Sequence, residues 1–249
     1  MIYEIRLKGR EKQGECSAIL TMTFLVMTLM TLTLNLMPMV YSSAVKPMLQ
    51  ESDEGKIITL AISSVLIFLF FVLLSCLSYG ADRFMLKRAE NTVAGAGDIF
   101  YYFSPIRTFS LMLFLAKVSI YKISILALLS GPFVICAVVF VSFCNRGFSA
   151  LVCGIFALFT LVFLISALVA YWKINDTLFL VRYRFIKGDY INFRQLLAQS
   201  QLDMTKKLHR LRSLRASFIG WFFLCLLILP LPYVWSYYRQ TKACFSVMD

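Results

Sequence analysis

Long apolar runs, separated by shorter polar and basic segments, form the dominant pattern along the chain. A helix rises about 1.5 Å per residue, so about 20 apolar residues cross a hydrocarbon core of about 30 Å. Five runs reach this length: 17–41, 57–81, 123–144, 149–171 and 216–238. The pattern predicts an all-α polytopic transmembrane helix bundle with about five spans, which forms a single integral membrane domain over 1–249.

A sixth apolar stretch, 106–122, differs from the others because Lys117 and Lys122 interrupt it. A lysine at the bilayer centre costs about 2.5–3.5 kcal/mol on insertion scales. We therefore expect 106–122 to be an interfacial or tilted helix that leads into the next span, with both lysines reaching toward the headgroups. The alternative is a separate sixth span.

The last run carries two prolines near its middle, in the sequence SFIGWFFLCLLILPLPYVWSYY over 217–238. Proline removes a backbone N–H donor and clashes with the preceding helical turn. Residues 216–229 alone would form a helix of about 21 Å, which is too short to cross. We therefore predict one span kinked at Pro230 and Pro232. Such kinks line transport sites in some carriers, and in other proteins they serve packing alone.

Basic residues predict the orientation of the spans. With five spans, segments 1–16, 82–107 and 172–215 lie on one side and hold eighteen Lys and Arg, against five on the other side. The positive-inside rule then places the N-terminus in the cytoplasm and the C-terminal tail outside. On this interpretation Tyr237 and Tyr238 are aromatic anchors at the outer interface. The first apolar run exceeds the 7–15 residues usual for a cleaved signal peptide, so we expect a signal anchor.

The composition agrees with a membrane location. Of the 249 residues, 60% are hydrophobic and 15% are charged. Soluble domains have about 45–50% apolar and about 25% charged residues. A soluble domain of this size could not bury so much apolar surface, so lipid is the expected solvent.

The segment 172–215 is predicted to be a basic cytoplasmic loop with an amphipathic helix from Phe193 onward. Its apolar positions recur at helical spacing, and basic residues occupy the opposite face. Such a helix suits the anionic headgroups of the cytoplasmic leaflet. The alternative is that the charge only fixes topology. No nucleic-acid-binding module surrounds it, so no nucleic acid is expected. The candidate lipid-surface contacts are Lys206, Lys207, Arg210 and Arg212.

The sequence offers no catalytic constellation. All thirteen acids lie outside the predicted spans, so an intramembrane proton relay or carboxylate dyad is not expected. Motifs for phosphate cradling, zinc proteolysis and a nucleophile elbow are missing from the chain. His209 is the one histidine, and the seven cysteines are scattered singly, so neither a metal site nor a cofactor is expected.

Two local features could suggest chemistry. The glycines of AGAG at 94–97 lack the strand and the lysine of a phosphate-binding loop, so we expect a turn in which Asp98 caps a short helix. Cys144 and Cys153 flank a short connection and could form a disulfide. Free cysteines that act as small hydrophobic residues are favoured over this bridge.

Two stretches resemble an uncharacterised bacterial family of polytopic membrane proteins, domain of unknown function 975. The run SFIGWFFL at 217–224 resembles that family's start of the last membrane segment, preceded by a serine and a methionine at Ser200 and Met204. FMLKRAENTVAGAGDIFYYF at 84–103 resembles its cytoplasmic connection, with matches at Asp98, Phe100 and Phe103. The chain departs from the family at Arg215, where an acid is usual, and at the two prolines, where a glycine-rich turn is usual. The resemblance implies a multi-pass protein of the bacterial cytoplasmic membrane, and it implies no reaction.

These observations favour a non-catalytic integral membrane protein. We expect an accessory subunit that interacts with membrane lipids and with a membrane-protein partner or a second copy of itself. The alternative is a permease-like component that translocates a small or peptidic substrate. The missing intramembrane acids and the missing inverted repeat favour the first hypothesis.

Overall fold

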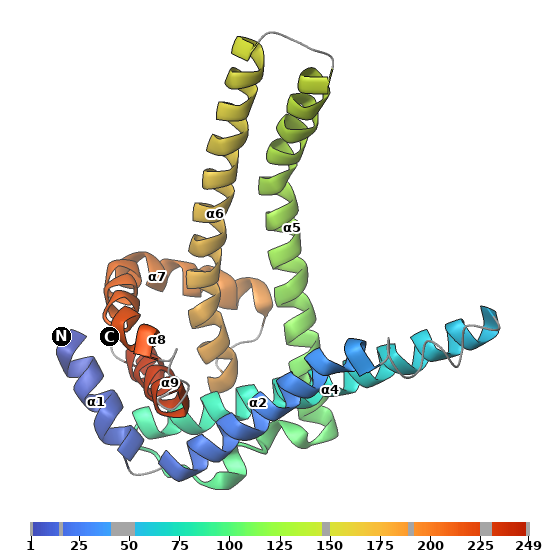
Figure 1. Ribbon diagram of the computed structural model, residues 1–249. Helices are drawn as coiled ribbons and strands as arrows, with labels where there is room; N and C mark the ends of the chain where they lie inside the picture. Colours follow the sequence, from blue (N-terminus) through green and yellow to red (C-terminus); the bar gives the residue numbers. More distant parts are fainter. Residues whose placement is uncertain are drawn as a thin grey trace. The chain divides into compact units, whose positions relative to one another are not determined.

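The computed structural model describes residues 2–14, 17–40, 53–145, 150–188, 192–224 and 231–247, which form helices and turns with no strand among them (Figure 1). The predicted all-α class is therefore confirmed for these residues. The elements are α1 (Ile2–Gly14), α2 (Ser17–Val40), α4 (Asp53–Ala89), η2 (Ala96–Asp98), η3 (Tyr101–Phe103), α5 (Pro105–Asn145), α6 (Ala150–Lys187), α7 (Phe193–Ala216), α8 (Ile219–Leu224) and α9 (Leu231–Val247).

Three helical stretches among the described residues are long and apolar enough to cross a membrane. They are Ala61–Ala89, Pro105–Asn145 and Gly154–Lys187, and a shorter apolar stretch covers Ala18–Thr33. By length and composition, these helices are compatible with a multi-pass membrane protein. They coincide with the first four apolar runs of the sequence, whereas the fifth run, 216–238, includes residues 225–230, which lie outside the described part of the chain.

The predicted single membrane domain contains two compact units. The first comprises Met1–Met112, Ile186–Gly188 and His209–Asp249, and the second comprises Leu113–Phe185 and Asp189–Leu208. In the first unit α9 packs against α1, α2 and α4, and α2 also packs against α4. The centre of this unit is apolar, because Leu20, Phe84, Met85, Phe218 and Val234 are almost fully buried.

The two described ends of the last apolar run contact each other, so the structure does not support the predicted single kinked span over 216–238. The ring of Phe218 lies 5.1 Å from the rings of both Tyr237 and Tyr238, and Trp221 lies 6.2 Å from Tyr233. A span would hold its two ends about 30 Å apart. The chain instead reverses, so that α8 and α9 lie against each other (Figure 1). Pro232 is the second residue of α9, and Pro230 lies outside the described residues.

The C-terminal helix α9 contacts the N-terminal helix α1. Arg6 of α1 donates from Nε to the hydroxyl of Tyr237 at 3.4 Å, and that hydroxyl donates to the Arg6 carbonyl at 3.3 Å. A Cβ added to Gly9 would lie 2.5 Å from Oγ1 of Thr241, so glycine is needed where α1 and α9 touch. The C-terminal helix therefore lies beside the N-terminal helix, and the role of Tyr237 as an interfacial anchor stays a prediction.

The stretch 106–122 belongs to one continuous helix, α5, which runs through Lys117, Lys122 and Pro132. Pro105 begins it at a position where a missing N–H costs nothing. Its 41 residues span about 60 Å, roughly twice the hydrocarbon thickness. No turn separates 106–122 from the next apolar run in this helix, so α5 lends no support to a separate sixth span, and the number of spans stays a prediction.

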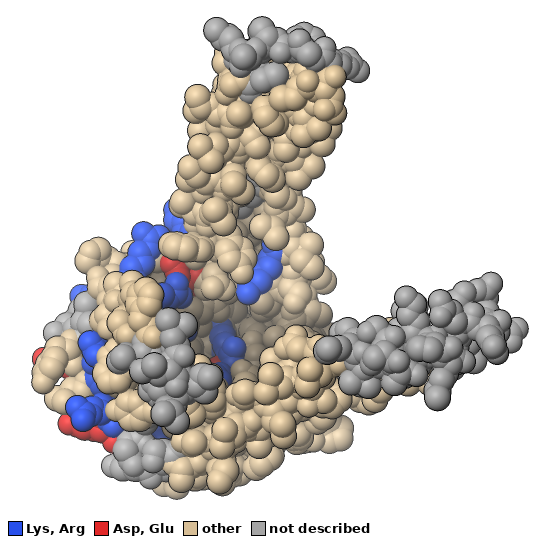
Figure 2. All heavy atoms as spheres, in the orientation of Figure 1, with Lys and Arg blue, Asp and Glu red and all other residues tan. Residues whose placement is uncertain are grey.

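In the second unit, α5 and α6 run antiparallel, as the ring contacts at both ends show (Figure 1). Phe114, near the start of α5, stacks on Phe185, near the end of α6, at 3.9 Å. Phe143, near the end of α5, meets Phe156, near the start of α6, at 5.0 Å. The outer part of this pair presents a surface without charged side chains in the view of Figure 2.

Candidate functional site

The residues at the end of α4 account for the turn that follows it. Asn91 has a φ of 59°, which an asparagine tolerates at a helix end. The Thr92 N–H donates to the Lys87 carbonyl at 2.9 Å and the Asn91 N–H donates to the Arg88 carbonyl at 3.1 Å, which closes the last turn of α4. The chain then folds back along α4, where a Cβ on Gly80 would lie 1.8 Å from the Ile99 carbonyl oxygen. Only glycine at 80 permits this approach.

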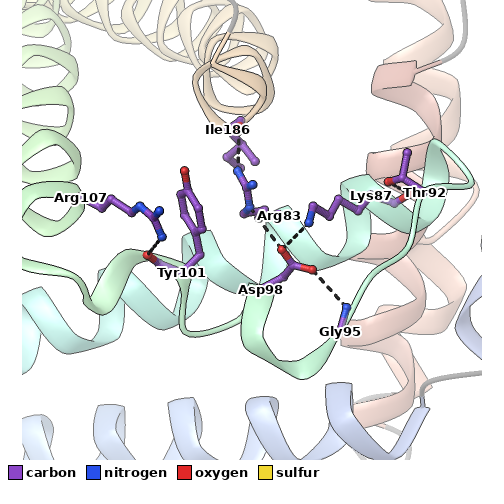
Figure 3. A network of polar contacts seen from close by, with 8 residues as sticks. All are labelled: Arg83, Lys87, Thr92, Gly95, Asp98, Tyr101, Arg107 and Ile186. Carbon is purple, nitrogen blue, oxygen red and sulfur yellow. Dashed lines mark hydrogen bonds and ion pairs between the residues drawn. The ribbon is translucent and has the colours of Figure 1, made fainter.

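Asp98 is the centre of a polar network in this turn (Figure 3). Its carboxylate accepts from Lys87 Nζ at 2.7 Å, from Arg83 Nε at 3.4 Å and from the Gly95 N–H at 3.1 Å. Gly95 is the N-cap of η2, and the Asp98 carboxylate accepts its N–H from the third position of this short helix, so the predicted capping role of Asp98 is confirmed. Burial alone would raise the pKa of Asp98, but the hydrogen bonds from Lys87, Gly95 and Arg83 and the charge of Lys87 lower it below the ordinary value.

Arg83 connects this turn to other parts of the first unit. Its Nη1 donates to the Ile186 carbonyl at 3.4 Å, and its guanidinium lies 3.7 Å from the centre of the Tyr101 ring. The Arg107 guanidinium lies 3.9 Å from the same ring centre, and Figure 3 shows Tyr101 between the two arginines. Nearby, Lys187 Nζ pairs with Glu90 at 2.6 Å. The network therefore links the turn, α4 and the last residues of α6.

A second acid in this region, Asp82 of α4, is buried and pairs with Arg239 of α9. The Asp82 side chain is 3% exposed. Arg239 also donates from Nη2 to the Ser78 carbonyl at 3.0 Å, and its guanidinium lies 4.7 Å from the Trp235 ring centre. The ion pair therefore fastens the C-terminal helix to the end of α4.

The residues predicted to contact a lipid surface all lie on α7. Lys206, Arg210 and Arg212 are exposed, and Lys207 is half-buried. The buried positions of α7 recur at helical spacing and include the polar Ser200: Leu196, Ser200, Met204, Leu211 and Leu214. The predicted helix is therefore present, although the structure does not test its contact with lipid.

Two grooves lie beside these elements, one in each unit. The first measures about 610 Å³ and is lined by apolar side chains of α2, α4 and the 96–103 turn, among them Met22, Val26, Leu77, Phe100 and Phe103. The second measures about 430 Å³ and combines apolar residues with Lys173, Thr177, Gln201 and Thr205. Neither of these two grooves is lined by Asp82, Asp98 or Arg83.

Comparisons with protein-family models, with curated proteins and with solved structures gave no match. The resemblance to the bacterial family with a serine, a methionine and an SFIGW run therefore stays a prediction. The expectation that Cys144 and Cys153 are free cysteines, with a disulfide as the alternative, also stays a prediction, since the Cys153 side chain lies outside the described residues.

Sequence reasoning missed the pairing of Asp82 with Arg239 and the grooves. The ion pair joins residues that the predicted topology had put on opposite sides of the membrane. An unexplained acid directly after an apolar run was the available signal, because a buried carboxylate needs a cation. The second groove has no local signal, because three helices contribute to it.

Proposed function

We propose that this chain is a non-catalytic, multi-pass protein of the bacterial cytoplasmic membrane, and that it acts as an accessory subunit which binds lipids and a membrane-protein partner. One observation carries the proposal. Four acids of the described chain form ion pairs with basic side chains: Asp82 with Arg239, Asp98 with Lys87 and Arg83, Glu90 with Lys187, and Asp203 with Arg184. A general acid, a general base or a proton relay must reach its substrate. These acids hold helices together instead.

The exposed apolar surface supports the second half of the proposal. In the most apolar windows of α5 and α6, 0% of the residues are buried, and in that of α4 only 11% are buried. Such surface requires lipid or another apolar protein surface around it. The first groove adds a concave apolar face on α2 and α4, which suits an apolar membrane segment of a partner.

The reversal of the C-terminal run leads us to propose four spans, within α2, α4, α5 and α6, with both termini in the cytoplasm. On this topology twenty Lys and Arg lie inside, and Lys46, Lys56 and Arg146 lie outside. This distribution is more asymmetric than that of the five-span hypothesis, as the positive-inside rule favours.

Co-purification of the intact protein in mild detergent tests the accessory role. We expect a membrane protein to be captured in fixed proportion. Phe100→Ser, which alters an exposed side chain of the first groove, should reduce capture, whereas Val93→Ser at a 95% exposed position outside it should not. If the protein purifies alone and carries a solute across proteoliposomes, the accessory role is wrong and the permease hypothesis replaces it.

A further inference from the structure

The second groove joins an apolar end to a polar, positively charged end. Its walls come from three helices of one unit: α5 supplies Tyr121 and Ile125, α6 supplies Ala170, Lys173, Ile174 and Thr177, and α7 supplies Gln201, Met204, Thr205 and Leu208. The volume of about 430 Å³ equals about 14 water molecules at about 30 Å³ each. That space accommodates a headgroup and the first part of an acyl chain.

The position of the groove along α6 matches a membrane interface. The uncharged part of the helix ends at Lys173, and the two residues before it, Tyr171 and Trp172, are 44% and 70% exposed. Exposed aromatic residues followed by a lysine are typical of the headgroup level. Ile125 and Ala170 lie on the sides of the groove that continue into the uncharged parts of α5 and α6.

The polar groups of the groove suit an anion. In the part of the chain that the structure describes, the Lys173 ammonium has no acidic partner. Gln201 Nε2 donates to the Tyr121 hydroxyl at 3.4 Å, which leaves that hydroxyl and the second amide N–H available as donors. Thr177 and Thr205 donate their hydroxyls to carbonyls of their own helices, at 3.1 and 2.7 Å. The free donors therefore converge from Lys173, Tyr121 and Gln201.

We propose that this groove binds one anionic phospholipid, with its phosphate at Lys173, Tyr121 and Gln201 and its acyl chains along Ile125, Ala170 and Ile174. The inference rests on the proposed lipid-binding function and names the chemistry of one of its ligands. It differs from the expected surface contact of Lys206 and its neighbours, because it places one lipid in a shaped site and not in a diffuse charge layer.

Native mass spectrometry of the full-length protein in mild detergent tests the site. The protein is titrated with dioleoyl phosphatidylglycerol, with dioleoyl phosphatidylcholine and with soluble glycerol phosphate. We expect one phosphatidylglycerol to be retained in preference to phosphatidylcholine. Lys173→Gln should weaken retention about fivefold, the effect of one basic group at a membrane surface. Lys8→Gln, an exposed lysine of α1 outside the groove and outside the candidate lipid-surface contacts, should change retention little.

A second variant keeps the test decisive if Lys173→Gln unfolds. Ala170→Phe fills the apolar end and leaves the charge in place, so it should displace the lipid while Lys8→Gln does not. Equal retention by wild type, Lys173→Gln and Ala170→Phe would overturn the site, and so would equally tight binding of glycerol phosphate. These outcomes are separate from the accessory role, because partner capture and solute flux are measured without added lipid.

Discussion

The carboxylate of Asp82 is buried against the guanidinium of Arg239, so an acid at the end of an apolar run is neutralised by the C-terminal helix. The pair brings together two residues that the five-span prediction puts on opposite sides of the membrane. It also explains how a charge can lie directly after a predicted span, since a buried charge is retained only with a partner.

Removal of either partner of the Asp82–Arg239 ion pair should therefore destabilise the folded protein. Arg239→Ala leaves the buried Asp82 carboxylate unpaired and should lower the free energy of unfolding by roughly 3–5 kcal/mol. Chemical unfolding in detergent measures this change. Arg210→Ala, at an exposed position of α7, should change stability by no more than about 0.5 kcal/mol. Equal stability of Arg239→Ala and Arg210→Ala would show that the ion pair does not hold α9.

The Asp98 network should contribute stability that depends on pH. Because the pKa of Asp98 is lowered on folding, its contribution is complete above the ordinary value of 3.8 and is lost as the pH falls through the folded value. Asp98→Asn should cost roughly 1–3 kcal/mol at pH 7. The difference between wild type and variant should shrink between pH 5 and pH 3, approximately the window that the lowered pKa defines.

Asp203→Asn provides the matched control for this pH series. Asp203 pairs with Arg184, but its side chain is 43% exposed, so its loss should cost at most about 1 kcal/mol. A constant difference between wild type and Asp98→Asn from pH 7 to pH 3 would contradict the linkage between the network and folding.

Gly80 should be the most sensitive glycine of the described chain. Gly80→Ala places a Cβ against the Ile99 carbonyl and forces the 96–99 segment away from α4, at a cost of about 1–3 kcal/mol. Gly97→Ala, where a Cβ meets nothing within 4 Å, should have little effect on stability. Thermal unfolding of the two variants compares them, and similar melting temperatures would exclude the close packing of this turn.

Pro232 should prove dispensable for the fold. It lies in the first turn of α9, where a backbone N–H has no partner within the helix. Pro232→Ala should therefore change the free energy of unfolding by no more than about 0.5 kcal/mol. If Pro232→Ala lowered the free energy of unfolding by several kcal/mol, the proline would be required for the reversal of the chain.

The sequence predicts well what depends on local pattern. Apolar runs and helical periodicity give α2, α4, α5, α6 and α7, and turn chemistry gives the cap at Asp98. The four apolar runs and α7 are long enough for the 3.6-residue period and the hydropathy to dominate other signals. The cap is predictable because Asp98 and Gly95 are close in the sequence.

The structure of the segment 216–238 could not be predicted from local pattern. Hydropathy and length are equal for a kinked span and for two short helices that fold back, so Pro230 and Pro232 fit either interpretation. The contacts that decide are tertiary: Phe218 and Trp221 with Tyr237, and Tyr237 with Arg6. The three walls of the second groove are likewise brought together only by the packing of α5, α6 and α7.

The location of the C-terminus tests the central claim most directly, because the account depends on the return of α9 to the side of α1. Two fusions at the carboxyl end are compared in bacterial cells: a fluorescent protein that folds only in the cytoplasm, and a phosphatase that is active only outside it. We predict bright fluorescence and an inactive phosphatase, since four spans and the contact between α1 and α9 place both termini inside. An active phosphatase with no fluorescence would contradict the reversal and restore a span over 216–238.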